Sequence, residues 1–146
     1  RAPDSGSLPA TVLRRGKETA VTLDLPAGWR FKSDIGKRVG TWPMRAMAFG
    51  GMKMDDLDDA TREQLGLTKD QMAFNIFHVG QYGPHAAAKK AGFKKDDILI
   101  EIGDLNTRMT ESAIIGHLLL SNLPGEKIPS VVLRGGERLK LELPQQ

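Results

Sequence analysis

The sequence predicts an α+β fold that is mainly β, with a sheet capped by two or three helices and an additional N-terminal β-hairpin. Residues 83–103 have the pattern of a turn, a short alanine-rich helix, a charged turn and an apolar strand. Residues 8–26 and 128–144 each have the pattern of two strands around a glycine turn. One longer amphipathic helix is expected within residues 106–125. Because strands outnumber helices in this pattern, the sheet is expected to dominate the fold.

Composition limits the classes of protein to consider. The chain has 146 residues, 40% hydrophobic and 27% charged, which is ordinary for a globular domain with a real core. Its net charge of +3 comes from scattered basic residues, which indicates a solvated surface and no nucleic-acid partner. No apolar run approaches the roughly 20 residues of a membrane span, and no cysteine is present for disulfides or thiolate sites. Because Arg1 is not a natural start, we expect a piece of a longer protein.

The run from Gly83 to Gly103 shows why each of its pieces should form. Pro84 suits the first turn of a helix, where its missing N–H group costs no hydrogen bond. Gly92 suits the position after a helix, where a positive φ is common. The isoleucines between Ile98 and Ile102 suit a buried strand. We therefore expect a short helix before Gly92, a charged turn over residues 94–97 and a strand after it.

The two ends of the chain resemble each other. In the first hairpin, strands are expected over residues 11–13 and 20–25, around a turn at residues 15–17. Pro9, residues 12–14 and Gly16 recur roughly 120 positions later, and after a two-residue difference in the turn, residues 23–26 match residues 141–144. This pattern favours an internal repeat, in which the first copy is the closing hairpin of a preceding module. The alternative is that two generic hairpins look alike.

We expect three segments in the chain. Residues 1–26 form the N-terminal hairpin, residues 27–43 form a connector that contains tryptophan, and residues 44–146 form the main domain. Trp29 and Trp42 are large apolar side chains that need cover, so we expect them to hold the connector against the fold. An aromatic binding platform is the alternative interpretation of these two residues.

Residues 44–67 contain two short motifs. Phe49-Gly50-Gly51-Met52 places two glycines between apolar residues, and glycine lets backbone N–H groups converge on an anion because it has no Cβ. Taken alone, a Gly-Gly pair is more often just a turn. Further along, Asp58 or Asp59 is expected to cap a short helix in which Leu65 faces inward, and Gly66 is expected to end it.

A strand and the main helix complete the domain. Residues 72–79 alternate between apolar and polar side chains, as a half-buried strand does. Thr110 is expected to cap the main helix at its N-terminus. The apolar stripe of this helix consists of Ile114, Ile115, Leu118 and Leu119.

Together these motifs resemble PDZ domains, especially those attached to bacterial HtrA-type proteases. The resemblance rests on the helix, the Ala91-Gly92-Phe93 break and the strand that follows, on the Leu-Gly-Leu segment at residues 65–67, and on the closing hairpin. It covers about two-thirds of the chain. One departure is Asp96-Asp97, where the family usually has Gly-Asp. The resemblance implies a partly open β-barrel or sandwich over residues 44–146.

The resemblance also implies a groove for an extended peptide. The glycine loop would hold the peptide's C-terminal carboxylate with help from Arg45, and the peptide would add as a strand beside residues 52–54. The main helix would form the other wall, through either Ile115 and Leu119 or Ile114 and Leu118. Gly50 stands where the family usually has a larger apolar residue. The predicted site residues are Arg45, Phe49, Gly50, Gly51 and Met52 in the carboxylate loop, and Lys53, Met54, Ile114, Ile115, Leu118 and Leu119 in the groove.

We therefore expect a non-catalytic module that binds peptide or protein C-termini as part of a larger protein. One alternative is an assembly module whose groove is filled by its own N-terminal hairpin or by one from a neighbouring molecule, the latter giving a homo-oligomer. The other is a regulatory domain of an extracytoplasmic serine protease. His78, His85 and His117 lack the spacing of metal ligands, and no serine lies in a nucleophile motif, so we expect no metal, cofactor or catalytic residue. By family resemblance alone, the location would be extracytoplasmic, in a periplasm.

Overall fold

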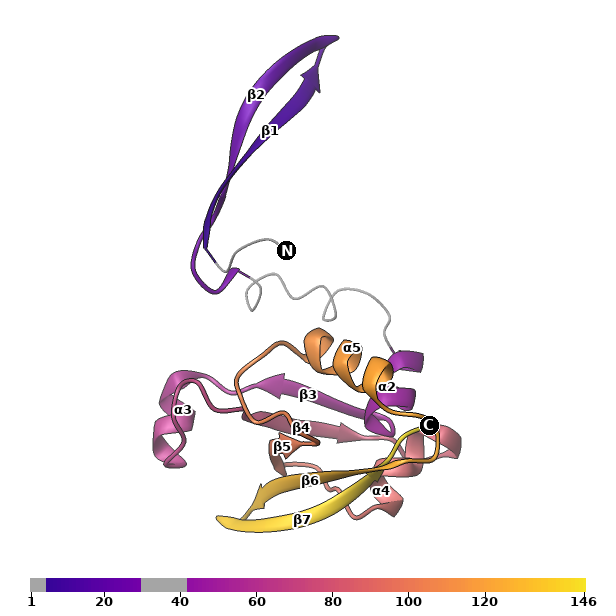
Figure 1. Cartoon of the computed structure of the whole chain (residues 1–146). Helices are drawn as coiled ribbons and strands as arrows, with labels where there is room; N and C mark the ends of the chain where they lie inside the picture. The colour runs from indigo at the N-terminus through magenta and orange to yellow at the C-terminus, as the bar shows by residue number, and fades with distance from the viewer. Residues whose placement is uncertain (1–4, 30–41) are drawn as a thin grey trace. The chain divides into compact units, whose positions relative to one another are not determined.

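The computed structural model describes residues 5–29 and 42–146, and the chain divides into two compact units, residues 1–34 and 35–146. Most of the predicted connector lies outside the described residues. The first unit contains β1 (Gly6–Arg14) and β2 (Lys17–Leu25). The second unit contains α2 (Trp42–Phe49), β3 (Met52–Asp56), α3 (Asp59–Gln64), β4 (Phe74–Val79), η2 (Gly83–Ala86), α4 (Ala87–Lys90), β5 (Ile98–Ile102), α5 (Glu111–Ser121), β6 (Lys127–Arg134) and β7 (Glu137–Pro144), as Figure 1 shows.

The first unit is an antiparallel hairpin, as predicted, with longer strands than the sequence pattern indicated. Its register pairs Gly6 with Leu25 at one end and Arg14 with Lys17 at the other. Arg15 and Gly16 form the two-residue turn, with φ values of 49° and 79°. Positive φ at both turn residues matches the twist of the flanking strands, so the turn itself sets the register.

The second unit is built on a five-stranded sheet in the order β3-β4-β5-β6-β7, in which every neighbouring pair is antiparallel. The predicted α+β, mainly β class is confirmed. Neither described sheet closes into a barrel, so the sheet of the second unit has two edges, β3 and β7. The register between β3 and β4 shifts between Lys53 and Met54, because Phe77 of β4 is an additional residue with no partner on β3.

The core of the second unit lies between the sheet and its helices. It joins α2, β3, β4, β5, α5 and the closing hairpin through Phe49, Met52, Met54, Met72, Phe74, Ile76, Phe93, Leu99, Ile102, Ile114, Leu118, Ile128, Val132 and Leu143. α5 packs against α2 and β3, whereas α4 packs against β7 (Figure 1). The sheet thus has helices beside both of its edges.

The predicted capping residues have their expected roles. The Thr110 side-chain oxygen accepts a hydrogen bond of 3.1 Å from the Ala113 N–H group at the start of α5. The Asp58 carboxylate accepts one of 2.7 Å from the Thr61 N–H group at the start of α3. This hydrogen bond favours the charged form and lowers the pKa of Asp58 below its usual value.

Residues 83–103 form the helix, turn and strand that the sequence predicts. η2 and α4 give the short helix, Gly92 leaves it with a φ of 98°, and β5 follows the charged turn. The Asp97 carboxylate is 1% exposed and accepts a 2.9 Å hydrogen bond from the Lys94 N–H group, which closes the turn. Asp96, one of the two aspartates that depart from the family pattern, has a φ of 68°. Asp is one of the residues that tolerates this region best after glycine.

Three details of the sequence interpretation are wrong. Leu65 does not face inward: it follows the last residue of α3 and is 42% exposed. The helix α2 begins at Trp42, so the last two residues of the predicted connector belong to a helix that continues into the predicted main domain. The two hairpin turns have equal length, because Gly135 and Gly136 also form a two-residue turn. The two-residue difference that the sequence comparison of the two hairpins placed in the turn is therefore absent. In the structure Leu23 corresponds to Leu143, whereas the sequence comparison matched it with Leu141.

Replacing Gly116 with alanine is expected to stabilise the second unit. Gly116 lies inside α5, where glycine costs up to about 1 kcal/mol relative to alanine. A Cβ built there meets no atom within 4 Å, so the added methyl group causes no clash. Thermal unfolding should show a higher midpoint for Gly116→Ala, and a lower midpoint would contradict this account of the helix.

Candidate functional site

The outer edge of β3 is the first feature of the candidate site. β3 pairs only with β4, so its other edge has no strand partner among the described residues. The Gly80 N–H group donates to the Gly51 oxygen at 3.1 Å, and the Leu57 N–H group donates to the Ala73 oxygen at 3.0 Å. In an antiparallel ladder these pairs alternate with pairs whose polar groups point outward. The N–H and C=O groups of Met52 and Met54 therefore point away from β4.

The helix α5 lies beside this edge (Figure 1). Three members of its predicted stripe are buried in the core: Ile114, Ile115 and Leu118. Leu119 packs against the core but stays partly accessible, and Leu120 on the neighbouring face is 90% exposed. The stripe is thus mainly a core element, and Leu119 is its accessible member.

The Gly50-Gly51 turn between α2 and β3 is tightly packed. Both residues have positive φ values, 56° and 87°. A Cβ at Gly51 would lie 2.2 Å from the backbone oxygen of His85, and one at Gly80 would lie 2.0 Å from the same oxygen. The Gly51 N–H group donates to the Arg45 oxygen at 3.1 Å. Close approach of η2 is therefore a sufficient reason for glycine here, and the Gly51 N–H group is already engaged.

Arg45, expected to help hold a carboxylate, contacts a carboxylate of the chain itself. Its Nε and Nη2 atoms donate to the two oxygens of Glu111 at 2.8 and 2.6 Å. Glu111 is buried at the start of α5, where a negative charge also favours the helix dipole. This two-bond ion pair joins α2 to α5 and fixes the helix that lies beside the β3 edge.

Aromatic contacts hold Lys53 and Trp42 at the start of β3. The Trp42 ring stacks on the His85 ring at a centroid distance of 4.9 Å and contacts the His78 ring at 5.6 Å. The Lys53 Nζ atom lies 5.0 Å from the Trp42 centroid, in a cation–π contact. His78 pairs with Lys53 across the ladder, so the two side chains lie on the same face of the sheet, and both contact the Trp42 ring. Sequence reasoning found no polar partner for Trp42 because these partners come from three separate segments.

A buried cluster of charged side chains lies at the C-terminal end of β3, around Asp56. Arg62 is fully buried and donates to Asp56 and to the backbone oxygens of Leu57, Gln71 and Ala73. Arg108 donates to the second Asp56 oxygen at 2.8 Å and to Asp59 at 2.7 Å. Asp56 therefore bridges two arginines and links the end of β3 to α3.

The cluster changes the affinity of its groups for protons. Burial lowers the pKa of Arg62, although Asp56 opposes this shift. Burial acts in the same direction on Arg108, but its hydrogen bonds to Asp59 and Asp56 outweigh burial and raise its pKa. The hydrogen bond from Arg108 lowers the pKa of Asp59. The sequence predicts only a helix-capping role for Asp59, because the spacing of charges along a chain does not reveal a partner that lies 49 residues away.

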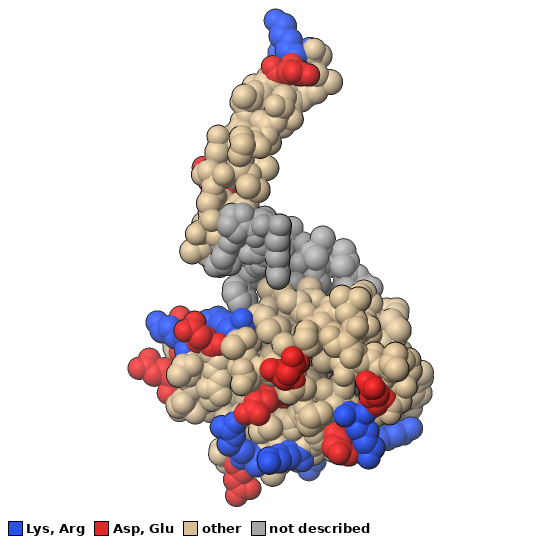
Figure 2. Space-filling view, viewed as in Figure 1, with Lys and Arg blue, Asp and Glu red and all other residues tan. Residues whose placement is uncertain are grey.

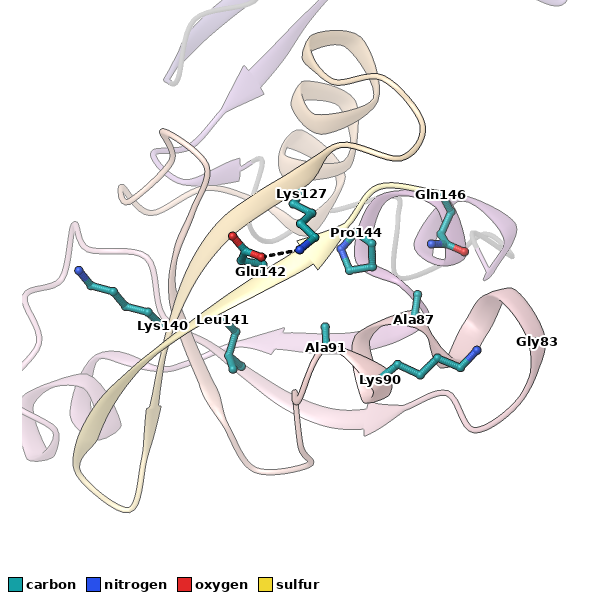
Figure 3. Close-up of a pocket in the computed structure, with 10 residues that line it drawn as sticks. All are labelled: Gly83, Ala87, Lys90, Ala91, Lys127, Lys140, Leu141, Glu142, Pro144 and Gln146. Carbon is teal, nitrogen blue, oxygen red and sulfur yellow. Dashed lines mark hydrogen bonds and ion pairs between the residues drawn. The ribbon is translucent and has the colours of Figure 1, made fainter.

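A hollow lies at the other edge of the sheet, between α4 and β7 (Figure 3). Its volume is about 540 Å³, and Ala87, Ala91, Leu141 and Pro144 give it apolar walls. Lys127 is paired with Glu142 at 2.9 Å on its rim. The hollow is thus a second place where an extended segment could lie beside an edge strand.

The described residues hold no group of three or more histidine, aspartate or glutamate side chains placed to bind a metal ion. On the face of the second unit that Figure 2 shows, lysine and arginine side chains are interspersed with aspartate and glutamate. No helix in the described part of the chain is long and apolar enough to span a bilayer.

Solved structures with a similar fold include two of one protease. A variant of the HtrA-type protease AlgW, solved with a decapeptide, matches with a TM-score of 0.56 over 94% of this chain and 40% of its own, at 16% identity. This chain has an HtrA-like fold. A second structure of AlgW with a decapeptide matches 65% of this chain and 27% of its own, at 23% identity and a TM-score of 0.49. The HtrA-like chain thus spans less than half of these proteins.

The predicted resemblance to HtrA-type modules is confirmed at the level of fold. No protein-family model matches the HtrA-like chain, and no curated protein matches its sequence. At such low identity the likeness concerns the fold, so the function must be argued from the edge of β3 and its surroundings.

Proposed function

We propose that the HtrA-like second unit is a non-catalytic module that binds an extended peptide segment as an added strand on the outer edge of β3. The observation that carries the proposal is the outward direction of the Met52 and Met54 backbone groups beside α5. A peptide strand would satisfy these groups, and Leu119 would contact one of its side chains. The affinity expected for such a short segment is on the order of micromolar, or about −8 kcal/mol.

The peptide's C-terminal carboxylate is proposed to contribute little. The Gly51 N–H group already donates to the Arg45 oxygen, and the Arg45 guanidinium is paired with Glu111. The predicted loop, Phe49 to Met52, then forms the closed end of the groove. We expect matched decapeptides with a free or an amidated C-terminus to bind within about threefold of each other. A much larger preference for the free acid would show that the loop opens to bind the carboxylate.

Replacing Leu119 with alanine is expected to weaken peptide binding by about tenfold, because about 1.4 kcal/mol of apolar contact is lost. The matched control is Leu120→Ala on the same helix, since Leu120 is 90% exposed and lies outside the proposed contact. Calorimetry with one decapeptide selected from a random library would measure both variants. Equal loss in the two variants would contradict the assignment of the groove.

The likeness to HtrA-type proteases supports a protease-associated role for the whole protein and an extracytoplasmic setting, both of which are part of this proposal. The peptide in the solved AlgW structures belongs to those proteins and is consistent with a peptide partner here.

A further inference from the structure

We propose that the hairpin β1–β2 is the closing hairpin of a second PDZ-like module and docks on that module as β6–β7 docks on β5. The partner would be a PDZ-like sheet with an open β5-type strand and an aspartate in the turn before it. The proposal is independent of peptide binding.

The two hairpins have the same register. Leu8 pairs with Leu23 in one hairpin, and Ile128 pairs with Leu143 in the other, so equivalent positions differ by 120 throughout. Both turns contain two residues with positive φ. Six pairs of equivalent residues are identical: Pro9 and Pro129, Val12 and Val132, Leu13 and Leu133, Arg14 and Arg134, Gly16 and Gly136, and Leu23 and Leu143. Because a slip of one residue would reverse the faces, this match places equivalent side chains on equivalent faces.

One face of β1–β2 has the composition of a core face. It consists of Leu8, Ala10, Val12, Thr19, Val21 and Leu23. Their equivalents in β6–β7 are Ile128, Ser130, Val132, Leu139, Leu141 and Leu143, which are all buried in the core or packed against it. The described part of the first unit has a sheet of these two strands only, so no third strand there covers this face, and Leu23 is 53% exposed. Figure 2 shows that the shaft of the hairpin is largely uncharged and that charged side chains gather at its tip. An isolated hairpin of two strands is marginally stable in water.

Arg14 indicates which side chain the partner should provide. Its equivalent, Arg134, donates from Nε and Nη2 to the two oxygens of Asp97 at 2.7 and 2.8 Å, and to the Gly92 oxygen at 2.8 Å. Asp97 is 1% exposed and closes the turn before β5. Arg14 is exposed on the same face as Val12. A partner with a buried aspartate at the position of Asp97 would therefore pair with Arg14.

A second copy of this chain does not fit as the partner. In each copy, β5 already pairs with β6 through residues 98–102 and 130–133, and Asp97 is already paired with Arg134. The hairpin would have to displace an equivalent hairpin that is covalently attached to its site. The partner is therefore a PDZ-like module that lacks its own closing hairpin.

The test is to graft residues 8–23 in place of residues 128–143 in the full chain. We expect the second unit to keep a single cooperative thermal transition. Arg134→Gln should lower its midpoint by about 10 °C, both with and without the graft. The control graft takes residues 9–24, which are shifted by one position and turn the apolar face outward; it should lose the transition. A milder graft replaces residues 128–136 with residues 8–16.

Loss of the cooperative transition in both in-register grafts would overturn the proposal. So would a shifted graft as stable as the in-register graft, or a graft that is insensitive to Arg134→Gln. Sedimentation of the full chain over a range of concentrations should show a monomer. A dimer that Val12→Asp dissociates would assign the hairpin to a second copy and would also overturn the proposal.

Discussion

Replacing Arg62 with methionine is expected to lower the free energy of unfolding of the second unit by about 3–5 kcal/mol. Arg62 is fully buried, and its guanidinium donates to Asp56 and to three backbone oxygens. Methionine fills a similar volume but donates no hydrogen bond, so these oxygens lose a partner in a place that water does not reach. Chemical denaturation of the full chain, monitored by tryptophan fluorescence and circular dichroism, would measure the loss.

Two further variants separate the charge of Arg62 from its geometry. Arg62→Lys keeps the charge but loses the planar fork of donors, so most of the loss should remain. Arg108→Met removes the other arginine that contacts Asp56. Because the Arg108 side chain is 24% exposed, this variant should lose about half as much free energy of unfolding as Arg62→Met, or less. If Arg108→Met were as damaging as Arg62→Met, burial of the Arg62 site would not be the cause.

Replacing Gly51 with alanine is expected to cost about 3 kcal/mol or more. A Cβ at this position would lie 2.2 Å from the His85 oxygen, which belongs to the backbone and moves only if η2 moves. The φ of 87° adds the strain of a left-handed conformation, about 1–2 kcal/mol for a residue with a Cβ. The variant should also shift the NMR signals of η2, because η2 has to move away from the turn.

Gly66→Ala is the matched control for Gly51→Ala. Gly66 has a similar positive φ of 69°, but a Cβ there meets nothing within 4 Å. It should therefore show only the left-handed strain, about 1–2 kcal/mol. Gly80→Ala approaches the same His85 oxygen but has no positive φ, so it should show the cost of the close contact without the left-handed strain. Equal effects at Gly51 and Gly66 would mean that close packing against His85 is unimportant.

The parts of the fold that depend on local sequence were predictable. Gly92, Thr110 and Asp58 each carry a local signal for a helix end, and the structure places each at a helix end. The hairpins were predictable because their turn residues and alternation act over a few positions. α2 was missed because a segment rich in methionine and alanine, followed by two glycines, gives no clear period. Leu65 was misplaced because an apolar residue at the end of a short helix has no fixed direction.

The candidate site was less predictable, because its chemistry depends on partners distant in sequence. Arg45 and Glu111 lie 66 residues apart, and Arg134 and Asp97 lie 37 apart. A single sequence marks these residues as charged but does not mark them as paired. Gly50 and Gly51 fit the pattern of an anion-binding loop, yet in the structure Gly51 allows η2 to approach, and Gly50 allows α4 to approach. The same residue type serves both purposes, and only the position of His85 distinguishes them.

Hydrogen exchange of the backbone amides, measured with and without a binding decapeptide, tests the central claim most directly. The Met52 and Met54 amides point away from β4 and have no strand partner, although the two residues are only 0% and 2% exposed, so their exchange should become slower still when a peptide strand pairs with them. The amides that already pair β3 with β4 should change little. Slower exchange at Met52 and Met54 is the result we predict. Slower exchange along β7, beside the hollow in Figure 3, with no change at β3 would contradict the account.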